Sequence, residues 1–400
     1  MPSSISPSTR SLHIAFQAVP APGHINPGLG LVSELAARGH RVTYAMNAAF
    51  APHVAAAGAT PVVYESTPGW VSGPGSEAID PGAAMMAFLD EAKAVLPQVE
   101  AAYREDRPDV IVHDIGGWPA PILARRWQVP YVLLSPTFVA YEGWEQDFAP
   151  DEAPGDGPPP PDAAFPEAMQ AWLAEEGFEG GFAELMTPER ALVVTPRAFH
   201  PRADTVGAQN TFAGPMLGER GFQGTWNAPE GDRPILLVSF GSAYTDRPEA
   251  YRACVQAFAD GAWHVVLCIG RHVDPAVLGE LPATIEVHRS IPQLDVLSKA
   301  DAFVSHGGMG GTMEALSHGV PIVAVPEIAE QRIVARQLEA LGIGSGLPLD
   351  ELTAEVLRVR VDGLAHDPGV TARLAAMQRE IQASGGPSAA ADIVERAARE

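Results

Sequence analysis

Basic side chains and long apolar runs are both scarce in this chain of 400 residues. It has 26 lysines and arginines against 49 aspartates and glutamates, so its formal net charge is −23. Such an acidic surface repels phosphate backbones and anionic lipids, so we expect neither nucleic acid nor a membrane surface as a partner. No segment reaches the roughly 18 uninterrupted apolar residues of a membrane-spanning helix, so we expect no membrane insertion.

Cysteine is also scarce, and its two positions exclude a disulfide framework. Cys254 and Cys268 show neither a CxxC motif nor paired histidine spacing, so we expect small buried side chains in a reducing compartment. The first ten residues, MPSSISPSTR, lack the apolar core of a secretory signal. We therefore predict a cytoplasmic protein whose acidity belongs to a solvated surface.

The length and the hydrophobic pattern predict two α/β domains. Four hundred residues exceed what one hydrophobic core usually supports, and 46% of them are hydrophobic. Short apolar runs alternate with helical patterns in both halves, as in parallel sheets covered by helices on both faces. The predicted strands are 13–19, 42–45, 61–64, 110–113, 131–135 and 191–195, followed by 235–240, 264–269, 285–288, 302–305 and 321–325.

These runs predict two Rossmann-like domains with a linker between them. We place the N-terminal domain at 1–213 and the C-terminal domain at 234–380. The segment 214–233 is rich in glycine, proline and charge, which is typical of a linker between domains. The last segment, 381–400, has a helical pattern.

A glycine-rich loop in the segment 302–331 predicts an anion site. After a buried strand come four glycines in five positions, Gly307, Gly308, Gly310 and Gly311, and then a helix. Backbone N–H groups at such a helix start have no internal partner, and glycine lets a phosphate approach them closely. Ordinary strand–helix turns also contain glycines, so the loop alone leaves phosphate binding open.

Two polar side chains near this loop favour a nucleotide over a simple anion. His306 precedes the glycines and adds a side-chain donor beside them. Glu314 lies one turn into the helix, where its carboxylate can accept two hydrogen bonds from a ribose diol. Together these groups match the needs of a sugar nucleotide.

A second candidate site lies at the first predicted strand–helix turn. His24 follows the strand 13–19 and precedes a helix that we expect at about 28–38, with Asn26 as its N-cap. Ligands of parallel α/β sheets bind beyond the carboxyl ends of the strands, which is where His24 lies. A loop histidine that only donates to a backbone carbonyl is the alternative.

Asp114 lies at the same edge of the predicted sheet, directly after the strand 110–113. A neutral imidazole that acts as a base must keep its proton on the other nitrogen, and a carboxylate there fixes the tautomer and stabilises the imidazolium. Asp114 is the best candidate for such a partner of His24. Capping the helix expected at 117–126 is the common alternative role for this aspartate.

Both segments resemble the signatures of family-1 glycosyltransferases, which use nucleotide sugars. In the C-terminal half the residues at the family's spacing are His306, Gly308, Thr312, Glu314, Pro321 and Gln331, with Glu330 at the usual acidic position. In the N-terminal half Gly23, His24 and Pro27 match the G-H-x-x-P pattern, in which the histidine is the general base. The family's dyad aspartate occupies the strand end at which Asp114 lies.

The resemblance covers about residues 12–395 and is greatest to bacterial macrolide glycosyltransferases. It implies the GT-B fold, in which an N-terminal acceptor domain faces a C-terminal donor domain and the last helix, here 381–400, packs back on the first domain. It also implies a set of donor contacts. They are Ser242, Ser290, Ile291, Gln293, His306, Gly308, Gly310, Gly311, Thr312, Glu314, Glu330 and Gln331.

Two positions depart from the family's pattern. Many members have Asn-Ser where this chain has Gly310-Gly311, and this difference leaves backbone N–H groups to hold the phosphate. An aromatic residue that stacks on the base often stands at the position of Ser290. Without it, we expect Ile291 and Gln293 to hold the base through backbone groups.

Aromatic and methionine side chains of the first half are the candidates for an acceptor pocket facing His24. They are Met85, Phe88, Trp118, Phe138, Tyr141 and Trp144. Such clusters are most often core, and we expect about half of these side chains to be core. The rest are predicted to line a wide apolar pocket.

The resemblance implies inverting transfer of a hexose, glucose from UDP-glucose, to a hydroxyl of an apolar acceptor such as a macrolide, a polyketide or a flavonoid. His24 is the expected base and Asp114 its partner. We expect no tightly bound cofactor and no metal, because no DxD-like motif stands near the donor loop.

Three other functions stay open. They are a transferase for dTDP-deoxysugars, a non-catalytic protein that binds a hydrophobic metabolite, and a nucleotide-sugar epimerase. The chain is expected to be a monomer or a homodimer. Its role, whether biosynthesis or antibiotic inactivation, is also open.

Overall fold

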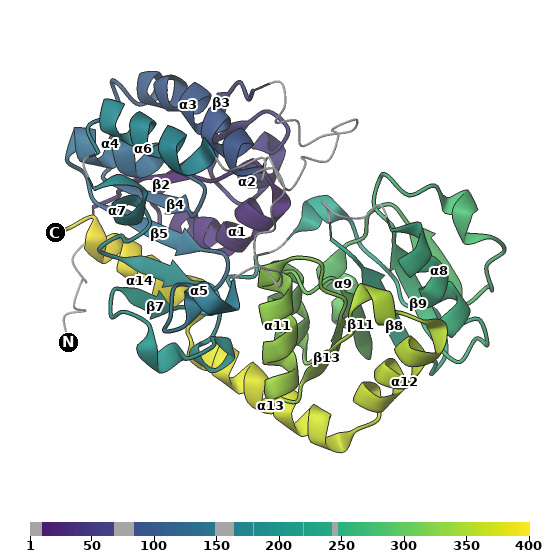
Figure 1. Cartoon of the computed structure of the whole chain (residues 1–400). Coiled ribbons are helices and arrows are strands. Elements are labelled where there is room, and N and C mark those ends of the chain that lie inside the picture. The colour runs from purple at the N-terminus through teal and green to yellow at the C-terminus, as the bar shows by residue number, and fades with distance from the viewer. Residues whose placement is uncertain (1–9, 68–83, 149–163, 179, 219, 242–246) are drawn as a thin grey trace, which may run out of the picture.

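A computed structural model describes residues 10–67, 84–148, 164–178, 180–218, 220–241 and 247–400. The molecule has two lobes, and its last helices run from the second lobe back to the first (Figure 1). None of the helices within the described ranges is both long enough and apolar enough to span a bilayer.

The first lobe contains a parallel sheet. In its described part seven strands are arranged in the order β3-β2-β1-β4-β5-β6-β7. The strands are β1 (His13–Gln17), β2 (Arg41–Asn47), β3 (Thr60–Tyr64), β4 (Val110–Asp114), β5 (Tyr131–Ser135), β6 (Ala191–Val193) and β7 (Asn210–Phe212). The helices are α1 (Pro22–Ala37), α2 (Ala51–Ala56), α3 (Ala84–Ala102), α4 (Pro119–Trp127), α5 (Trp144–Asp147), α6 (Phe165–Glu175) and α7 (Gly181–Leu185), with the 3₁₀ turns η3 (Arg197–Phe199) and η4 (Ala203–Thr205).

The second lobe contains another parallel sheet. Its described strands are arranged in the order β10-β9-β8-β11-β12-β13. They are β8 (Ile235–Ser239), β9 (His264–Cys268), β10 (Ile285–His288), β11 (Ala302–Ser305), β12 (Ile322–Ala324) and β13 (Gly344–Gly346). The helices are α8 (Pro248–Ala257), α9 (Gln293–Leu297), α10 (Met309–His318), α11 (Ala329–Ala340), α12 (Ala354–Ala365) and α13 (Pro368–Ala383), with η6 (Pro275–Leu278) and η7 (Leu349–Glu351). The linker contains η5 (Gly221–Gln223), and the last helix, α14 (Gly386–Ala397), packs on the core of the first lobe.

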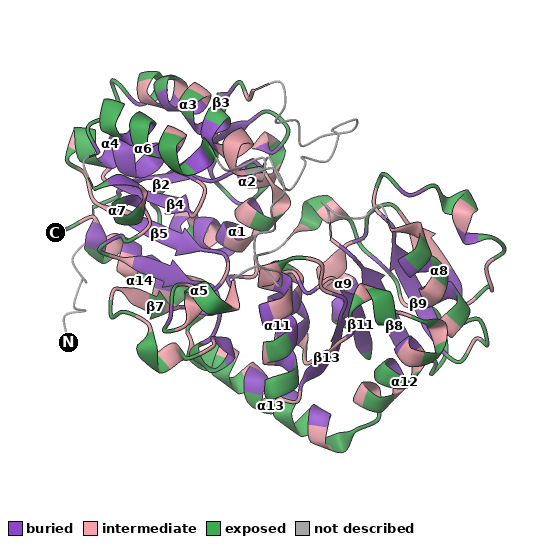
Figure 2. Cartoon of the chain, viewed as in Figure 1, coloured by how far each residue is buried: buried purple, intermediate pink, exposed green. Residues whose placement is uncertain are grey.

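The central strands are buried on both faces, as parallel strands covered by helices must be. Every residue of β1, β4, β8 and β9 is buried, and Figure 2 shows the strands as the most continuous buried part of each lobe. The strand order reverses at β1, which pairs with both β2 and β4, and at β8, which pairs with both β9 and β11. A crevice for ligands is expected beyond the carboxyl ends of the strands at such reversals.

The prediction of an α/β protein with two Rossmann-like domains is confirmed. The strands β7 and β13 lie outside the predicted set, because each has only three residues at a sheet edge and Gly344–Gly346 has no apolar side chain. The expected start of the first helix is wrong. Ala21 has the extended backbone of an N-cap and Pro22 stands at the first helical position, so Asn26 lies inside α1.

The linker and the C-terminal helices tie the two lobes together. A Cβ atom on Gly30 of α1 would lie 2.4 Å from the carbonyl oxygen of Met216, so only glycine lets the linker backbone pass this close to the helix. The α14 helix contacts α1. There Arg38 forms ion pairs with Asp392 at 2.5 Å and with Glu395 at 2.9 Å.

We expect Gly30→Ala to destabilise the protein, although alanine is the better helix former. The new methyl group must displace the backbone at Met216, and overpacking of this kind lowers the free energy of unfolding by about 1–3 kcal/mol. Gly363→Ala in α12 is the matched control, because nothing lies within 4 Å of the new atom there. We expect that variant to gain about 0.5–1 kcal/mol. Urea unfolding of both variants measures the difference, and equal stability would contradict the close contact.

Candidate active site

His24 lies in the first turn of α1, directly beyond the carboxyl end of β1. Its Nδ1 forms a short hydrogen bond with Oδ2 of Asp114. The side chain is 24% exposed, and among the described residues its Nε2 has no hydrogen-bond partner. The imidazole is therefore fixed through Nδ1, and its Nε2 is available to a ligand.

Asp114 is the last residue of β4, the strand that pairs with β1. Its side chain is 1% exposed, and its Oδ1 accepts a hydrogen bond from the backbone N–H of Val19 at 3.2 Å. Helix α4 begins only at Pro119, and its N-cap residue is Trp118. Asp114 therefore does not cap α4.

The surroundings of His24 make it a stronger base. Burial lowers the pKa of His24, but the charge of Asp114 and its hydrogen bond raise it by more, and the charge of Glu330 adds to this effect. The pKa is therefore raised above its ordinary value. A histidine whose Nδ1 proton is held by a carboxylate presents Nε2 as the atom that accepts a proton.

Glu330 extends from the second lobe toward the first. It lies in the first turn of α11, and Thr137, which follows β5, donates its hydroxyl hydrogen to Oε1 of Glu330 at 2.8 Å. Burial raises the pKa of Glu330, while the Thr137 hydrogen bond and the charge of His24 oppose the rise. This carboxylate thus bridges the lobes and lies within electrostatic reach of His24.

The glycine-rich loop forms the start of α10. Gly308 is the N-cap, and its carbonyl accepts the backbone N–H of Thr312 at 3.0 Å, which leaves the N–H groups of Met309, Gly310 and Gly311 without helical partners. Gly310 is exposed, and a Cβ atom there would meet no atom of the described residues within 4 Å. The helix start therefore has both the free donors and the space that a phosphate requires.

His306 lies between Gly308 of this loop and Gly241, which follows β8. A Cβ atom on Gly308 would lie 2.4 Å from Nε2 of His306, and one on Gly241 would lie 2.6 Å from Cε1. Burial lowers the pKa of His306 to about 4. His306 is therefore a neutral donor near pH 7, not a cation.

Glu314 is buried and already has two partners. Its Oε1 forms an ion pair with Arg220 of the linker at 2.6 Å, and its Oε2 accepts from Nε2 of Gln293 at 2.7 Å. The structure thus brings Gln293 to the predicted ribose carboxylate through its side chain, whereas the sequence predicted a backbone contact with the base.

Two further predicted donor residues use their side chains within the protein. The hydroxyl of Thr312 donates to the carbonyl of Gly308 at 2.9 Å. The Oε1 atom of Gln331 accepts the backbone N–H groups of Glu327 at 2.8 Å and Ile328 at 3.4 Å, which caps α11. Ser290 is exposed and Ile291 is buried, while Ser242 lies outside the described residues.

The predicted acceptor side chains divide between two places. Phe88 lies beside His24 with ring centroids 6.2 Å apart, and Met85 on the same helix is half-buried. Trp118 touches Phe88 but is buried against Phe165. Of these three, Phe88 and Met85 are half-buried, as a pocket wall requires, whereas Trp118 is buried.

The other three predicted acceptor residues follow β5. Phe138 stacks on Phe199, and Tyr141 donates to Asp147 at 2.8 Å, and both are buried. Trp144 stacks on Phe148 with centroids 4.0 Å apart. Phe138 and Tyr141 therefore pack as core side chains, and they do not line an open pocket.

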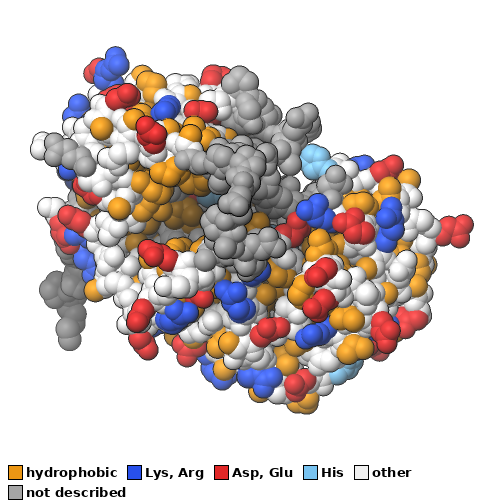
Figure 3. Space-filling model, in the orientation of Figure 1, with side chains coloured by type: hydrophobic (Ala, Val, Ile, Leu, Met, Phe, Trp, Pro, Cys, Tyr) orange, Lys and Arg blue, Asp and Glu red, His pale blue; other side chains and the backbone are white. Residues whose placement is uncertain are grey.

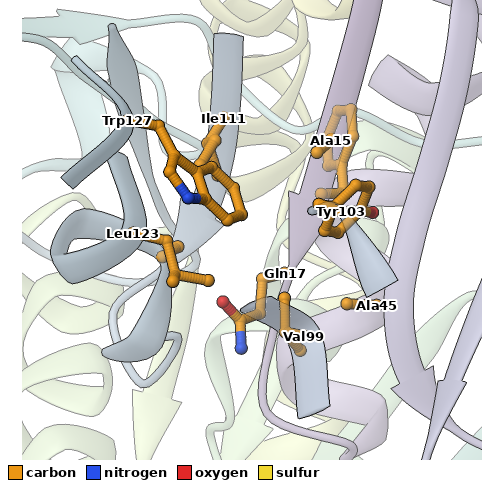
Figure 4. A pocket seen from close by; sticks show the side chains of 10 residues that line it. Ala15, Gln17, Ala45, Val99, Tyr103, Ile111, Leu123 and Trp127 are labelled. Atoms are coloured by element: carbon orange, nitrogen blue, oxygen red, sulfur yellow. The ribbon is translucent and has the colours of Figure 1, made fainter. Parts of the chain in front are cut away.

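An acceptor needs more space than the enclosed cavity of the N-terminal lobe offers. Figure 4 shows that cavity, of about 10 Å³, between the sheet and helices α3 and α4. It has room for at most one water molecule. By contrast, Figure 3 shows hydrophobic side chains gathered around a hollow in the face of the N-terminal lobe.

Sequence reasoning missed Arg220 and Thr137. A single arginine in a linker and a single threonine after a strand belong to no motif, and their partners are 94 and 193 positions away. Among the described residues no group of three or more histidine, cysteine, aspartate or glutamate side chains could hold a metal ion.

Comparisons with known proteins show the family to which the chain belongs. Residues 255–397 match the family described as "Erythromycin biosynthesis protein CIII-like, C-terminal domain". Oleandomycin glycosyltransferase of Streptomyces antibioticus is 43% identical over 394 residues, which cover 97% of this chain and 91% of that protein. Demethyllactenocin mycarosyltransferase of Streptomyces fradiae is 37% identical over 406 residues, with coverage of 97% and 87%.

Similarity to solved structures extends over the whole fold. The glycosyltransferase of kitacinnamycin superposes with a TM-score of 0.85 at 43% identity, and the match covers 97% of this chain and 99% of that one. The predicted GT-B architecture and the predicted family are thereby confirmed. The chain belongs to the bacterial macrolide-type glycosyltransferases, which have the GT-B fold.

Proposed function

We propose that this glycosyltransferase transfers a hexose, with inversion, from UDP-glucose to a hydroxyl of an apolar acceptor such as a macrolide, a polyketide or a phenol. His24 takes the proton of the acceptor hydroxyl at Nε2. The oxygen then attacks the anomeric carbon and the UDP leaves from the opposite face of the sugar. One bond forms between the acceptor oxygen and the sugar as the bond to diphosphate breaks.

The observation that carries this proposal is the arrangement of His24, Asp114 and Glu330. Asp114 holds Nδ1 of His24, so that Nε2 is the proton acceptor, and Glu330 of the opposite lobe is close enough to raise the pKa of His24. A base of raised pKa at the interface between the lobes suits the activation of an alcohol. A protein that only stored a hydrophobic metabolite would have no use for this pair.

The donor side supports a diphosphate leaving group. The free N–H groups of Met309, Gly310 and Gly311 and the neutral imidazole of His306 are preorganised donors for the charge that develops on the diphosphate. We propose that they act without a metal ion, and activity that persists in EDTA would support this.

A ribonucleotide fits the ribose side better than a deoxyribonucleotide. Glu314 is a buried carboxylate, and a ribose diol offers it two hydroxyl donors where a deoxyribose offers one. This observation favours UDP-glucose over a dTDP-sugar. A dTDP-deoxysugar stays the second candidate donor, because one of the similar proteins is named a mycarosyltransferase.

The direct test is mass spectrometry of reactions that combine UDP- and dTDP-sugars with macrolide and flavonoid acceptors. We expect a mass increase of one hexose with UDP-glucose, and NMR of the product should show the inverted anomer. Transfer from dTDP-deoxysugars alone would replace UDP-glucose as the donor. Donor turnover without any glycosylated acceptor would contradict the proposed reaction.

We expect His24→Ala to lower kcat by about 10²–10⁴-fold, the usual contribution of a general base. The affinity for UDP should change little, because the donor loop belongs to the other lobe. Steady-state kinetics and calorimetry measure the two effects. His272→Ala, at an exposed histidine, is the matched control and should leave both unchanged. Equal kcat in the His24 and His272 variants would contradict the assignment of His24 as the general base.

Asp114→Asn separates electrostatic support of His24 from packing. The amide oxygen can still accept the Val19 N–H, so we expect a folded protein with a nearly normal Tm. The amide cannot stabilise the imidazolium, so kcat should fall by up to about 10²–10⁴-fold. The loss should be smaller for phenols, whose hydroxyl pKa of about 10 demands less of the base.

The pH profile of Asp114→Asn adds a readout that packing alone would not change. His24 must be neutral to accept a proton, so activity falls as pH falls through its pKa. The charge of Asp114 raises this pKa, and its removal should move the acidic limb of kcat/KM to lower pH. A limb that stays in place, or unchanged rates with an aliphatic alcohol, would show that His24 works without Asp114.

A further inference from the structure

The linker places an arginine in the predicted ribose site. The side chains of Arg220 and Glu314 are each 6% exposed, and they form an ion pair at 2.6 Å. The other oxygen of Glu314 accepts from Gln293. A ribose therefore cannot bind both oxygens of Glu314 while Arg220 stays where it is.

The hydrogen bonds of Arg220 are incomplete in this position. A guanidinium has five N–H donors, and the buried Nε of Arg220 has no partner among the described residues. A buried donor without a partner is unfavourable, and an anionic ligand with several oxygens would satisfy it. The buried Nδ1 of His306 likewise has no hydrogen-bond partner in the described part of the chain.

The start of α10 lies within reach of the guanidinium. Glu314 follows Gly310 by four residues, which corresponds to about 6 Å along a helix. Rotation about the bonds of the long arginine side chain covers such a distance. A Cβ atom on Gly310 would lie more than 4 Å from any described atom, so the described residues leave space for a phosphate beside this glycine.

The linker that carries Arg220 contacts both lobes. After Arg220, Trp226 donates its backbone N–H to Asp295 at 3.3 Å and its indole N–H to Glu286 at 3.2 Å, both in the second lobe. Between them, Phe222 packs on His53 of the first lobe with ring centroids 4.3 Å apart. A shift of Arg220 is therefore expected to change linker contacts with both lobes.

We propose that Arg220 changes partner when the donor binds, from Glu314 in the free protein to the diphosphate in the complex. The ribose diol takes the oxygen that Arg220 leaves, and the guanidinium compensates the charge of the phosphates. Arg220 thus binds the donor in the complex, and in the free protein its ion pair with Glu314 blocks the proposed ribose site. This inference rests on the proposed use of a nucleoside-diphosphate sugar.

Calorimetric titration of the full-length protein with uridine and with UDP tests both halves of the proposal. Both ligands need Glu314 to be free, whereas only UDP offers phosphates to Arg220. In Arg220→Gln we expect tighter uridine binding, because the ligand no longer has to break the ion pair between Arg220 and Glu314. The ratio of the uridine Kd to the UDP Kd should fall by about 10- to 100-fold, the contribution of a hydrogen bond between charged groups.

Arg233→Gln is the matched control, because it removes the same charge from an exposed position of the same linker. Arg220→Lys keeps the charge and should recover part of the UDP affinity. Thermal unfolding of each variant establishes that it is folded. A UDP Kd that is the same in Arg220→Gln and Arg233→Gln, or weaker uridine binding in Arg220→Gln than in the wild type, would overturn the proposal.

The two proposals fail in different ways. A wild-type protein that binds neither UDP nor dTDP contradicts the proposed function and this inference with it. A wild-type protein that binds UDP and transfers the sugar, with no change in the ratio on removal of Arg220, contradicts the inference alone.

Discussion

The parallel direction of every strand pair among the described residues is the constraint on which the site depends. Because parallel strands end at the same edge of a sheet, the residues that follow β1 and β4 meet in one lobe, as do those that follow β8 and β11 in the other. His24 and Asp114 come together in this way although they are 90 positions apart. Linker packing on α1 and the α14 contact with α1 then hold the two edges face to face.

Three buried or half-buried carboxylates near the interface between the lobes each have a partner. Asp114 has His24, Glu314 has Arg220, and Glu330 has Thr137. A buried carboxylate that loses its partner is strongly unfavourable, so these contacts restrict how the lobes and the linker lie in the free protein. In the proposed complex the donor replaces some of these contacts, so we expect its binding to be coupled to rearrangement at this interface.

Two histidines that follow strands, His24 after β1 in the first lobe and His306 after β11 in the second, acquire opposite properties from their surroundings. His24 faces two carboxylates, which raise its pKa, whereas His306 is enclosed by backbone and burial lowers its pKa to about 4. The first is suited to accept a proton and the second to donate a hydrogen bond while neutral. The surroundings of each histidine, and not the residue type, determine whether it is suited to accept a proton or to donate a hydrogen bond.

The sequence by itself determined the alternating strands and helices, the glycine-rich helix start and the motif around His24, because these are local patterns of hydrophobicity and spacing. It also located Asp114 at a strand end, but its role as partner rather than helix cap was decided by the pairing of β1 with β4. Only the tertiary structure decided that Phe138 and Tyr141 are core, that Gln331 caps a helix and that Arg220 pairs with Glu314. Those outcomes depend on contacts between segments far apart in the chain, and no local pattern specifies which polar groups such contacts leave free.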